Sequence, residues 1–222
     1  MKIFYDGIDI HKYPEAEGIT TNCTLMAGKC YTDYYNSISN ELRGRPISFQ
    51  VWEDDVDKII KQIKEIHAID SSIFVKIPIM NSEGVWNDIA IQFCIDNRIP
   101  INITAIYTLE QVERAKKLLG NSGLPKIISI FAGPISDTGV NPDPIIRTAK
   151  ELFKNNRNTD ILWAGCREVY SIERARRAGA DIITVPDSIM EKLPSLRADL
   201  TLLSLERIKK FKKDATNKLT RI

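Results

Sequence analysis

Short apolar runs alternate with longer amphipathic segments from one end of this chain to the other. Eight runs have the length and the β-branched composition of strands, at residues 2–6, 18–20, 46–51, 73–77, 100–106, 126–131, 160–164 and 181–185. Between two of them, Val56, Ile59, Ile63 and Ile66 recur three and four positions apart, which is the spacing of a helix that buries one face. Further helical patterns cover residues 109–119, 143–153 and 172–178.

The number and order of these segments predict the fold. Strand–helix repeats are typical of a parallel sheet in an α/β protein, and eight of them predict a (β/α)8 TIM barrel. A doubly wound open sheet is the alternative, but it usually has fewer strands, and its glycine-rich fingerprint is missing from the sequence. No low-complexity stretch or change in composition divides the chain, so we expect one domain over residues 1–222.

The end of the chain predicts one more amphipathic helix, at about residues 201–217. Its apolar stripe consists of Leu202, Leu205, Ile208 and Phe211. The lysines at positions 209, 210, 212 and 213 form its polar face, which is the usual arrangement for a solvated helix surface. The formal net charge of the whole chain is only +2, so we expect no nucleic-acid partner.

Composition excludes several other classes of protein. No segment has the 18 or so consecutive apolar residues of a membrane span, and the chain begins with a strand pattern where a signal peptide would be expected. Its four cysteines and two histidines lack the spacing of metal ligands, so we expect no metal site. We therefore expect a cytoplasmic protein without a membrane partner.

One strand contains a lysine where an apolar residue is expected. In IFVKIPI, residues 73–79, Lys76 lies among isoleucine, valine and phenylalanine, and Pro78 follows it. Burying an ammonium group is unfavourable unless the charge is paired. One explanation is a lysine whose charged end reaches solvent at the end of the strand. The other is an amine whose pKa is lowered until it acts as a nucleophile.

Polar residues occupy similar positions at the ends of other expected strands. They are Asp6, Thr20, Thr21, Asn22, Gln50, Asn102 and Thr104. Catalytic groups of such barrels lie at the carboxyl ends of the strands, so these side chains are expected to surround Lys76. A buried polar network without a function is the alternative explanation.

Three of these segments resemble the signature segments of a known family. GITTN (residues 18–22), FVKIP (74–78) and NITAIY (102–107) are similar to those of the transaldolase family, in particular its short-chain branch with the small transaldolases and fructose-6-phosphate aldolase. The resemblance extends in register over nearly the whole chain. It implies a class I mechanism, in which a lysine of the fourth strand forms a Schiff base with a keto sugar.

The resemblance also implies a role for each site residue. Lys76 would be the Schiff-base lysine and Asp6 the acid/base at the C4 hydroxyl. Thr104 and Gln50 would hold the water that transfers protons. Asn22 and Asn102 would bind hydroxyls of the three-carbon unit, and Ser129 its C1 end. No metal or organic cofactor is implied, because the protonated imine accepts the electrons.

Two positions distinguish the members of this family that transfer the three-carbon unit from those that only cleave the sugar. By the family's pattern, transaldolases have glutamate at the position of Gln50 and phenylalanine at that of Phe131, whereas the aldolases have glutamine and tyrosine. This chain combines the aldolase-like Gln50 with the transaldolase-like Phe131. The tyrosine hydroxyl helps release the product, so Phe131 favours transfer to an aldehyde acceptor. A lyase that releases dihydroxyacetone, and a sugar-binding barrel without activity, are the alternatives.

The expected phosphate anchors are incomplete. Where the family has arginine after the sixth strand, this chain has Pro134, and where it has serine after the seventh, this chain has Gly165. Arg167 remains as the basic residue, and Cys23 replaces the proline that usually follows GITTN. We therefore expect a sugar substrate other than an ordinary monophosphate, or a phosphate held elsewhere.

Oligomeric state follows only from the resemblance. Small transaldolases form rings of five, often doubled to ten, in which the C-terminal helix reaches a neighbouring subunit. We expect a homo-oligomer of this kind, a pentamer or decamer. A C-terminal helix that packs on its own barrel fits the apolar stripe equally well.

Overall fold

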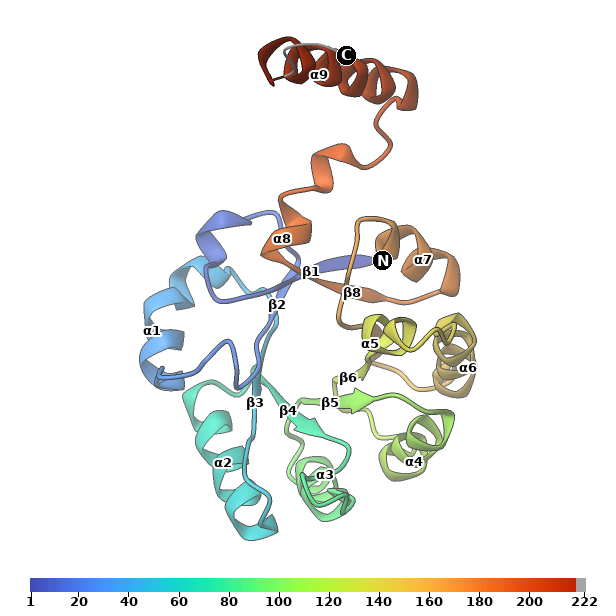
Figure 1. Cartoon of the computed structure of the whole chain (residues 1–222). Helices are drawn as coiled ribbons and strands as arrows, with labels where there is room; N and C mark the ends of the chain where they lie inside the picture. Colours follow the sequence, from blue (N-terminus) through green and yellow to red (C-terminus); the bar gives the residue numbers. More distant parts are fainter. Residues whose placement is uncertain (219–222) are drawn as a thin grey trace.

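The predicted strands form a closed parallel barrel (Figure 1). A computed structural model describes residues 1–218. The strands are β1 (Lys2–Asp6), β2 (Gly18–Thr20), β3 (Ile47–Gln50), β4 (Phe74–Pro78), β5 (Ile101–Ile106), β6 (Lys126–Ile130), β7 (Thr159–Trp163) and β8 (Ile182–Pro186). Each pairs with the next, and β8 closes the barrel by pairing with β1. The TIM-barrel prediction is confirmed, and each strand lies within one residue of its predicted bounds.

Helices surround the barrel and connect successive strands from β2 to β8, and two more helices follow β8 (Figure 1). They are α1 (Tyr31–Leu42), α2 (Val56–Ile69), α3 (Asp88–Asp96), α4 (Leu109–Leu119), α5 (Ala132–Asp137), α6 (Asp143–Phe153), α7 (Tyr170–Ala178), α8 (Asp187–Met190) and α9 (Leu200–Lys218). Local sequence fixes where several begin. The Asp55 carboxylate accepts hydrogen bonds from the first turn of α2, and Thr108 with Gln111 forms a capping box at α4.

Apolar side chains fill two separate regions. The larger lies between the strands and the surrounding helices, and the smaller consists of Phe4, Ile127, Leu162, Ala164 and Ile182. These five residues lie on β1, β6, β7 and β8 or immediately after β7, and they pack together inside the barrel. The interior packing also requires a glycine: a Cβ atom at Gly18 would lie 2.5 Å from the Phe4 ring. This apolar layer supports the polar residues nearer the carboxyl ends of the strands.

The C-terminal helix differs from the others because it extends away from the barrel (Figure 1). The helix predicted at about 201–217 is confirmed as α9, which follows a short 3-10 turn at Leu193–Ser195. Its apolar stripe is exposed: Leu202 is 59% and Phe211 62% accessible. The protein's own barrel therefore does not cover this stripe.

Within residues 1–218, none of the helices combines the length and apolar character needed to cross a membrane.

Candidate active site

Strand register places three of the predicted residues side by side. Gln50 of β3 pairs with Lys76 of β4, and Lys76 pairs with Asn102 of β5. Paired residues of parallel strands point to the same face of the sheet. Lys76 lies two residues before Pro78, the last residue of β4, so this polar row is near the carboxyl end of the barrel.

The Lys76 ammonium group has few polar partners. Its side chain is buried, with the residue 7% exposed, and Nζ donates one hydrogen bond, of 2.9 Å, to the Thr21 carbonyl oxygen. Burial lowers the pKa of Lys76, while Asp6 and, to a smaller extent, Cys23 act in the opposite direction. The charged end of Lys76 therefore does not extend into solvent. Because its pKa is lowered, the neutral amine forms at a lower pH than in an ordinary lysine.

Asp6, at the end of β1, is the carboxylate that faces Lys76. The Thr20 hydroxyl donates to Asp6 Oδ1 at 3.2 Å, and Thr20 itself shares a hydrogen bond with Thr184 of β8. Burial raises the pKa of Asp6, and the Lys76 charge and the Thr20 hydrogen bond partly offset this effect. The two opposite shifts bring an acid and an amine towards intermediate pKa values, as acid–base chemistry requires.

Thr104 presents a buried hydroxyl towards the same interior. It lies two residues after Asn102 on β5, hence on the same face, and its Oγ1 has no hydrogen-bond partner among the described residues. The next residue, Ala105, has φ of 58°, and the pairing of β5 with β6 shifts register here. Thr104 thus lies directly before an irregular point of β5.

Asn102 and Ser129 are in direct contact with each other. The Ser129 hydroxyl donates to Asn102 Oδ1 at 2.7 Å, and Asn102 Nδ2 donates to Ser48 Oγ at 3.1 Å. All three residues are buried. Asn102 therefore has one amide hydrogen and one acceptor position left for a ligand.

The segment after β2 forms another part of the mouth. Asn22 Oδ1 accepts a hydrogen bond from the Leu25 backbone at 2.9 Å, which leaves its amide NH2 group for other partners. Tyr31 donates its hydroxyl hydrogen to the Gln50 carbonyl oxygen at 2.7 Å. Cys23 lies against the same carbonyl, with Sγ 3.9 Å away. These contacts hold the Asn22 side chain and the Gln50 backbone.

Phe131 follows β6 and lies against Tyr107, which follows β5. Their ring centroids are 5.4 Å apart, and the rings are tilted by 33°. Phe131 also packs against the inner apolar cluster. The wall of the site is thus hydrocarbon at position 131.

Arg167 is engaged away from the polar row. Its Nε lies 3.0 Å and its Nη2 2.9 Å from Oδ2 of Asp137, the last residue of α5. The structure thus brings together Asp6, Gln50, Lys76, Asn102 and Thr104, and joins Ser129 to them through Asn102. It places Arg167 in a separate ion pair.

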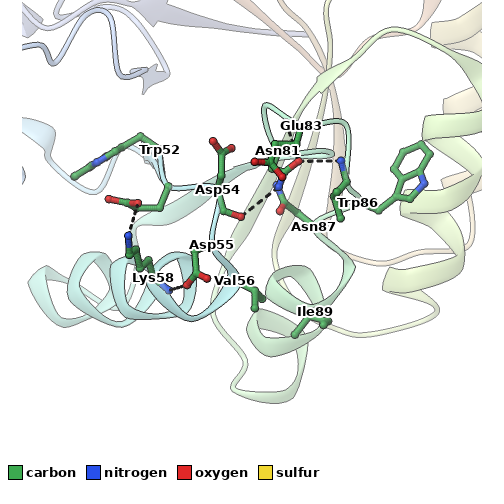
Figure 2. A pocket seen from close by; sticks show the side chains of 12 residues that line it. Trp52, Asp54, Asp55, Val56, Lys58, Asn81, Glu83, Trp86, Asn87 and Ile89 are labelled. Atoms are coloured by element: carbon green, nitrogen blue, oxygen red, sulfur yellow. Dashed lines mark hydrogen bonds and ion pairs between the residues drawn. The ribbon is translucent and has the colours of Figure 1, made fainter.

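A hollow of about 670 Å³ lies beside the mouth, between the segments that follow β3 and β4 (Figure 2). Trp52, Asp54, Asn81 and Trp86 contribute to its lining. Ser82 donates from its backbone and its hydroxyl to the Asp54 carboxylate, at 2.8 and 2.6 Å. These contacts join the two segments that form the rim of the hollow. Among the described residues, none of the predicted site residues lines this hollow.

Comparison with known proteins identifies the family. The family model described as Transaldolase/Fructose-6-phosphate aldolase matches residues 3–222. The chain belongs to this family.

Relatives named as transaldolases are similar over nearly their whole length. A "Probable transaldolase" of Sulfurihydrogenibium sp. is 31% identical over 219 residues, with 95% of each chain covered. One of Geobacter metallireducens is 32% identical, with 95% of this chain and 97% of the relative covered. Among solved structures, 3-hexulose-6-phosphate synthase from Salmonella typhimurium has a TM-score of 0.61 at 12% identity, covering 86% of this chain and 91% of that one. The last similarity shows the fold alone.

Ser48 and Asp137, which bind predicted site residues, escaped the sequence analysis. Ser48, which binds Asn102, lies two positions before Gln50 in an otherwise apolar strand, so strand alternation alone could have indicated it. Asp137, the partner of Arg167, is on a six-residue helix, and no sequence pattern connects it with the β7 loop.

Proposed function

We propose that this protein is a class I transaldolase-type enzyme that transfers a three-carbon ketol unit from a ketose to an aldehyde acceptor. The observation that carries the proposal is the position of Lys76, which is buried near the carboxyl end of the barrel. Around it lie a carboxylate and a hydroxyl that has no partner among residues 1–218. Membership of the transaldolase/fructose-6-phosphate aldolase family supports this type of chemistry.

The reaction begins at the amine. Neutral Lys76 attacks the ketone carbon, and the carbinolamine loses water to give a protonated imine. The lowered pKa of Lys76 supports this step, because only the neutral form is a nucleophile. Thr104 and Gln50 are the proposed partners of the water that carries protons during dehydration.

Cleavage then uses Asp6 as a base. Asp6 removes the proton of the C4 hydroxyl, the bond between C3 and C4 breaks, and an aldehyde leaves. The electron pair of that bond moves to the imine, which becomes an enamine on Lys76. Asn22, Asn102 and Ser129 are the proposed ligands of the hydroxyls of the bound three-carbon unit.

Transfer completes the cycle when the enamine attacks an acceptor aldehyde. Asp6 returns its proton to the new hydroxyl, and water hydrolyses the imine. The hydrocarbon at Phe131 favours this outcome over cleavage, because it offers no hydroxyl to protonate the enamine. A lyase that releases dihydroxyacetone remains the second candidate, since Gln50 is the aldolase-like residue.

The exposed stripe of α9 supports a homo-oligomer. We extend the proposal to packing of Leu202, Leu205, Ile208 and Phe211 on another copy of the chain, in a ring of five or ten subunits. A molar mass measured by light scattering that stays at one subunit would contradict it. All four cysteines are free thiols, which agrees with a cytoplasmic reaction.

Borohydride trapping tests the chemistry. The protein is incubated with a panel of ketoses, with and without phosphate, then reduced and examined by intact mass and peptide mapping. We expect a three-carbon adduct on the Lys76 peptide, and none in Lys76→Met. Labelling that persists in Lys76→Met would refute the assignment. Release of free dihydroxyacetone without an acceptor aldehyde would favour the lyase.

A further inference from the structure

The loops after the last strands of the barrel are where phosphate groups are often held in this fold. Such sites use backbone N–H groups at the start of a short helix together with the loops after strands seven and eight. The corresponding segments here are the start of α5, residues 164–169 after β7, and the start of α8. Each can be examined for the donors that a phosphate would need.

The start of α5 offers few donors. The Gly133 N–H already donates to the Ala164 carbonyl oxygen at 3.1 Å, and Pro134 has no N–H. The two loops are also in close contact, because a Cβ atom at Gly133 would lie 1.6 Å from the Gly165 oxygen. Neither Gly133 nor Pro134 thus offers an amide to a phosphate, and the close contact of Gly133 with Gly165 leaves no space between them.

Arg167 is directed away from this place. Two of its nitrogens bind Asp137 Oδ2, and its Cγ lies close to Gly133, 3.3 Å from where a Cβ atom there would be. The side chain thus extends along α5 from Gly133 to Asp137, which is four residues or about 6 Å of helix. Its charge is neutralised by a carboxylate at that end.

The start of α8 is no better suited to an anion. Its first residue is Asp187, a carboxylate, and the nearest cation is Lys12, whose Nζ lies 3.7 Å from Asp187 Oδ1. Here too the positive charge is next to an acidic side chain. A terminal phosphate would meet negative charge on both sides of the β7 loop.

We infer that the substrate is a ketose whose end distal to the carbonyl is uncharged, and that Asp137 is a specificity-determining residue because it holds Arg167 away from the mouth. The inference rests on the proposed function, which places the ketone at Lys76. The reacting part of the sugar lies at the β4 to β6 side, and its far end meets the loops described above.

The first measurement is independent of catalysis. Melting temperatures are recorded with inorganic phosphate and with fructose 6-phosphate, using Asp160→Asn as the control variant. Asp160 pairs with Lys2 at the opposite end of the barrel, and comparison at equal salt removes general stabilisation by phosphate. We expect no saturable rise for the wild type or the control. Pro134→Arg and Asp137→Asn should each gain one.

The second measurement is the ratio of kcat/KM for fructose 6-phosphate to that for fructose. We expect a ratio near or below about one in the wild type, because neither charge nor space favours the phosphate. Pro134→Arg should raise the ratio about ten- to a hundredfold, as one charge-assisted contact to phosphate would. Asp137→Asn should raise it less, and adding Arg167→Gln should cancel that gain.

Gly165→Ser is unsuitable for this test. Gly165 has φ of 71°, and a Cβ atom would lie 2.5 Å from Pro134 Cδ, so the variant would be strained for reasons unrelated to phosphate.

Distinct outcomes would overturn the inference and the proposed function. A wild-type protein that phosphate stabilises in a saturable way, with the effect lost in Arg167→Gln, would refute the inference and leave Schiff-base chemistry untouched. A protein that traps no ketose on Lys76 would refute the proposed function, while the melting experiment still decides whether phosphate has a site.

Discussion

Two lysines are buried at opposite ends of the barrel, and their surroundings differ. Lys126, 1% exposed, is the first residue of β6, whereas Lys76, 7% exposed, is near the end of β4. Lys126 Nζ donates to three carbonyl oxygens, those of Ser122, Leu124 and Arg157, at 2.5, 2.8 and 3.3 Å. Lys76 Nζ donates to one.

Burial alone therefore does not distinguish the lysine that we propose to be reactive. It lowers the pKa of both residues, and the nearby Lys116 lowers that of Lys126 further. An ammonium group has three N–H donors, and at Lys126 three carbonyls accept from them. That lysine links the segments that lead into β6 and β7. At Lys76 one carbonyl accepts, and a titratable acid and polar side chains lie nearby; such groups can exchange protons with a substrate.

The largest expected effect comes from replacing each lysine by methionine. Lys76→Met should remove all borohydride trapping and leave the melting temperature close to that of the wild type. Lys126→Met should keep trapping but lower the stability by about 2 to 4 kcal/mol, or roughly 5 to 15 °C, because three buried carbonyls lose their donor. Calorimetry and intact mass on both variants measure this. Equal loss of trapping in the two variants would contradict the proposed difference between Lys76 and Lys126.

The second effect concerns the acid beside Lys76. Asp6→Asn should still trap a donor ketose but turn over at least about a hundredfold more slowly, since a positioned acid or base contributes this much or more. Single-turnover trapping compared with steady-state kcat separates the two steps. Near-normal kcat in Asp6→Asn would show that another group moves the proton.

Much of this site could be predicted from the sequence because strand alternation and strand ends are local features. Lys76, Gln50 and Asn102 lie in three consecutive strands, so their row follows once the barrel is assumed. The state of Arg167 could not be predicted in this way. Its partner Asp137 is 30 residues away on another element, and only the packing of the loops brings them together.

A third and smaller effect is expected at Thr104. Thr104→Val should slow imine formation about tenfold or more, the lower part of the range for groups that assist proton transfer. Stability should be unchanged or rise by up to about 1 kcal/mol, because the lost hydroxyl is buried without a partner among the described residues. Borohydride trapping stopped at a series of times measures the rate of imine formation, and thermal melts measure the stability of the variant. A large loss of stability would mean that the hydroxyl is a structural group.

The smallest effect is a displacement along the pH axis. Asp6 raises the pKa of Lys76, so Asp6→Asn should lower it further and increase the neutral fraction at a given pH. The rate of imine formation should therefore reach its plateau at lower pH in the variant than in the wild type. Cyanoborohydride trapping of both proteins across the same buffers measures the shift. A plateau that moves to higher pH would contradict the proposed coupling.

The left-handed backbone at Ala105 matters for attempts to improve this protein. A residue other than glycine in that conformation costs roughly 1 kcal/mol or more, and here it directly follows Thr104 in β5. A selection that rewards heat resistance alone would favour changes that relieve this cost and that alter the backbone next to Thr104. Libraries for thermal improvement should leave residues 103–106 unvaried.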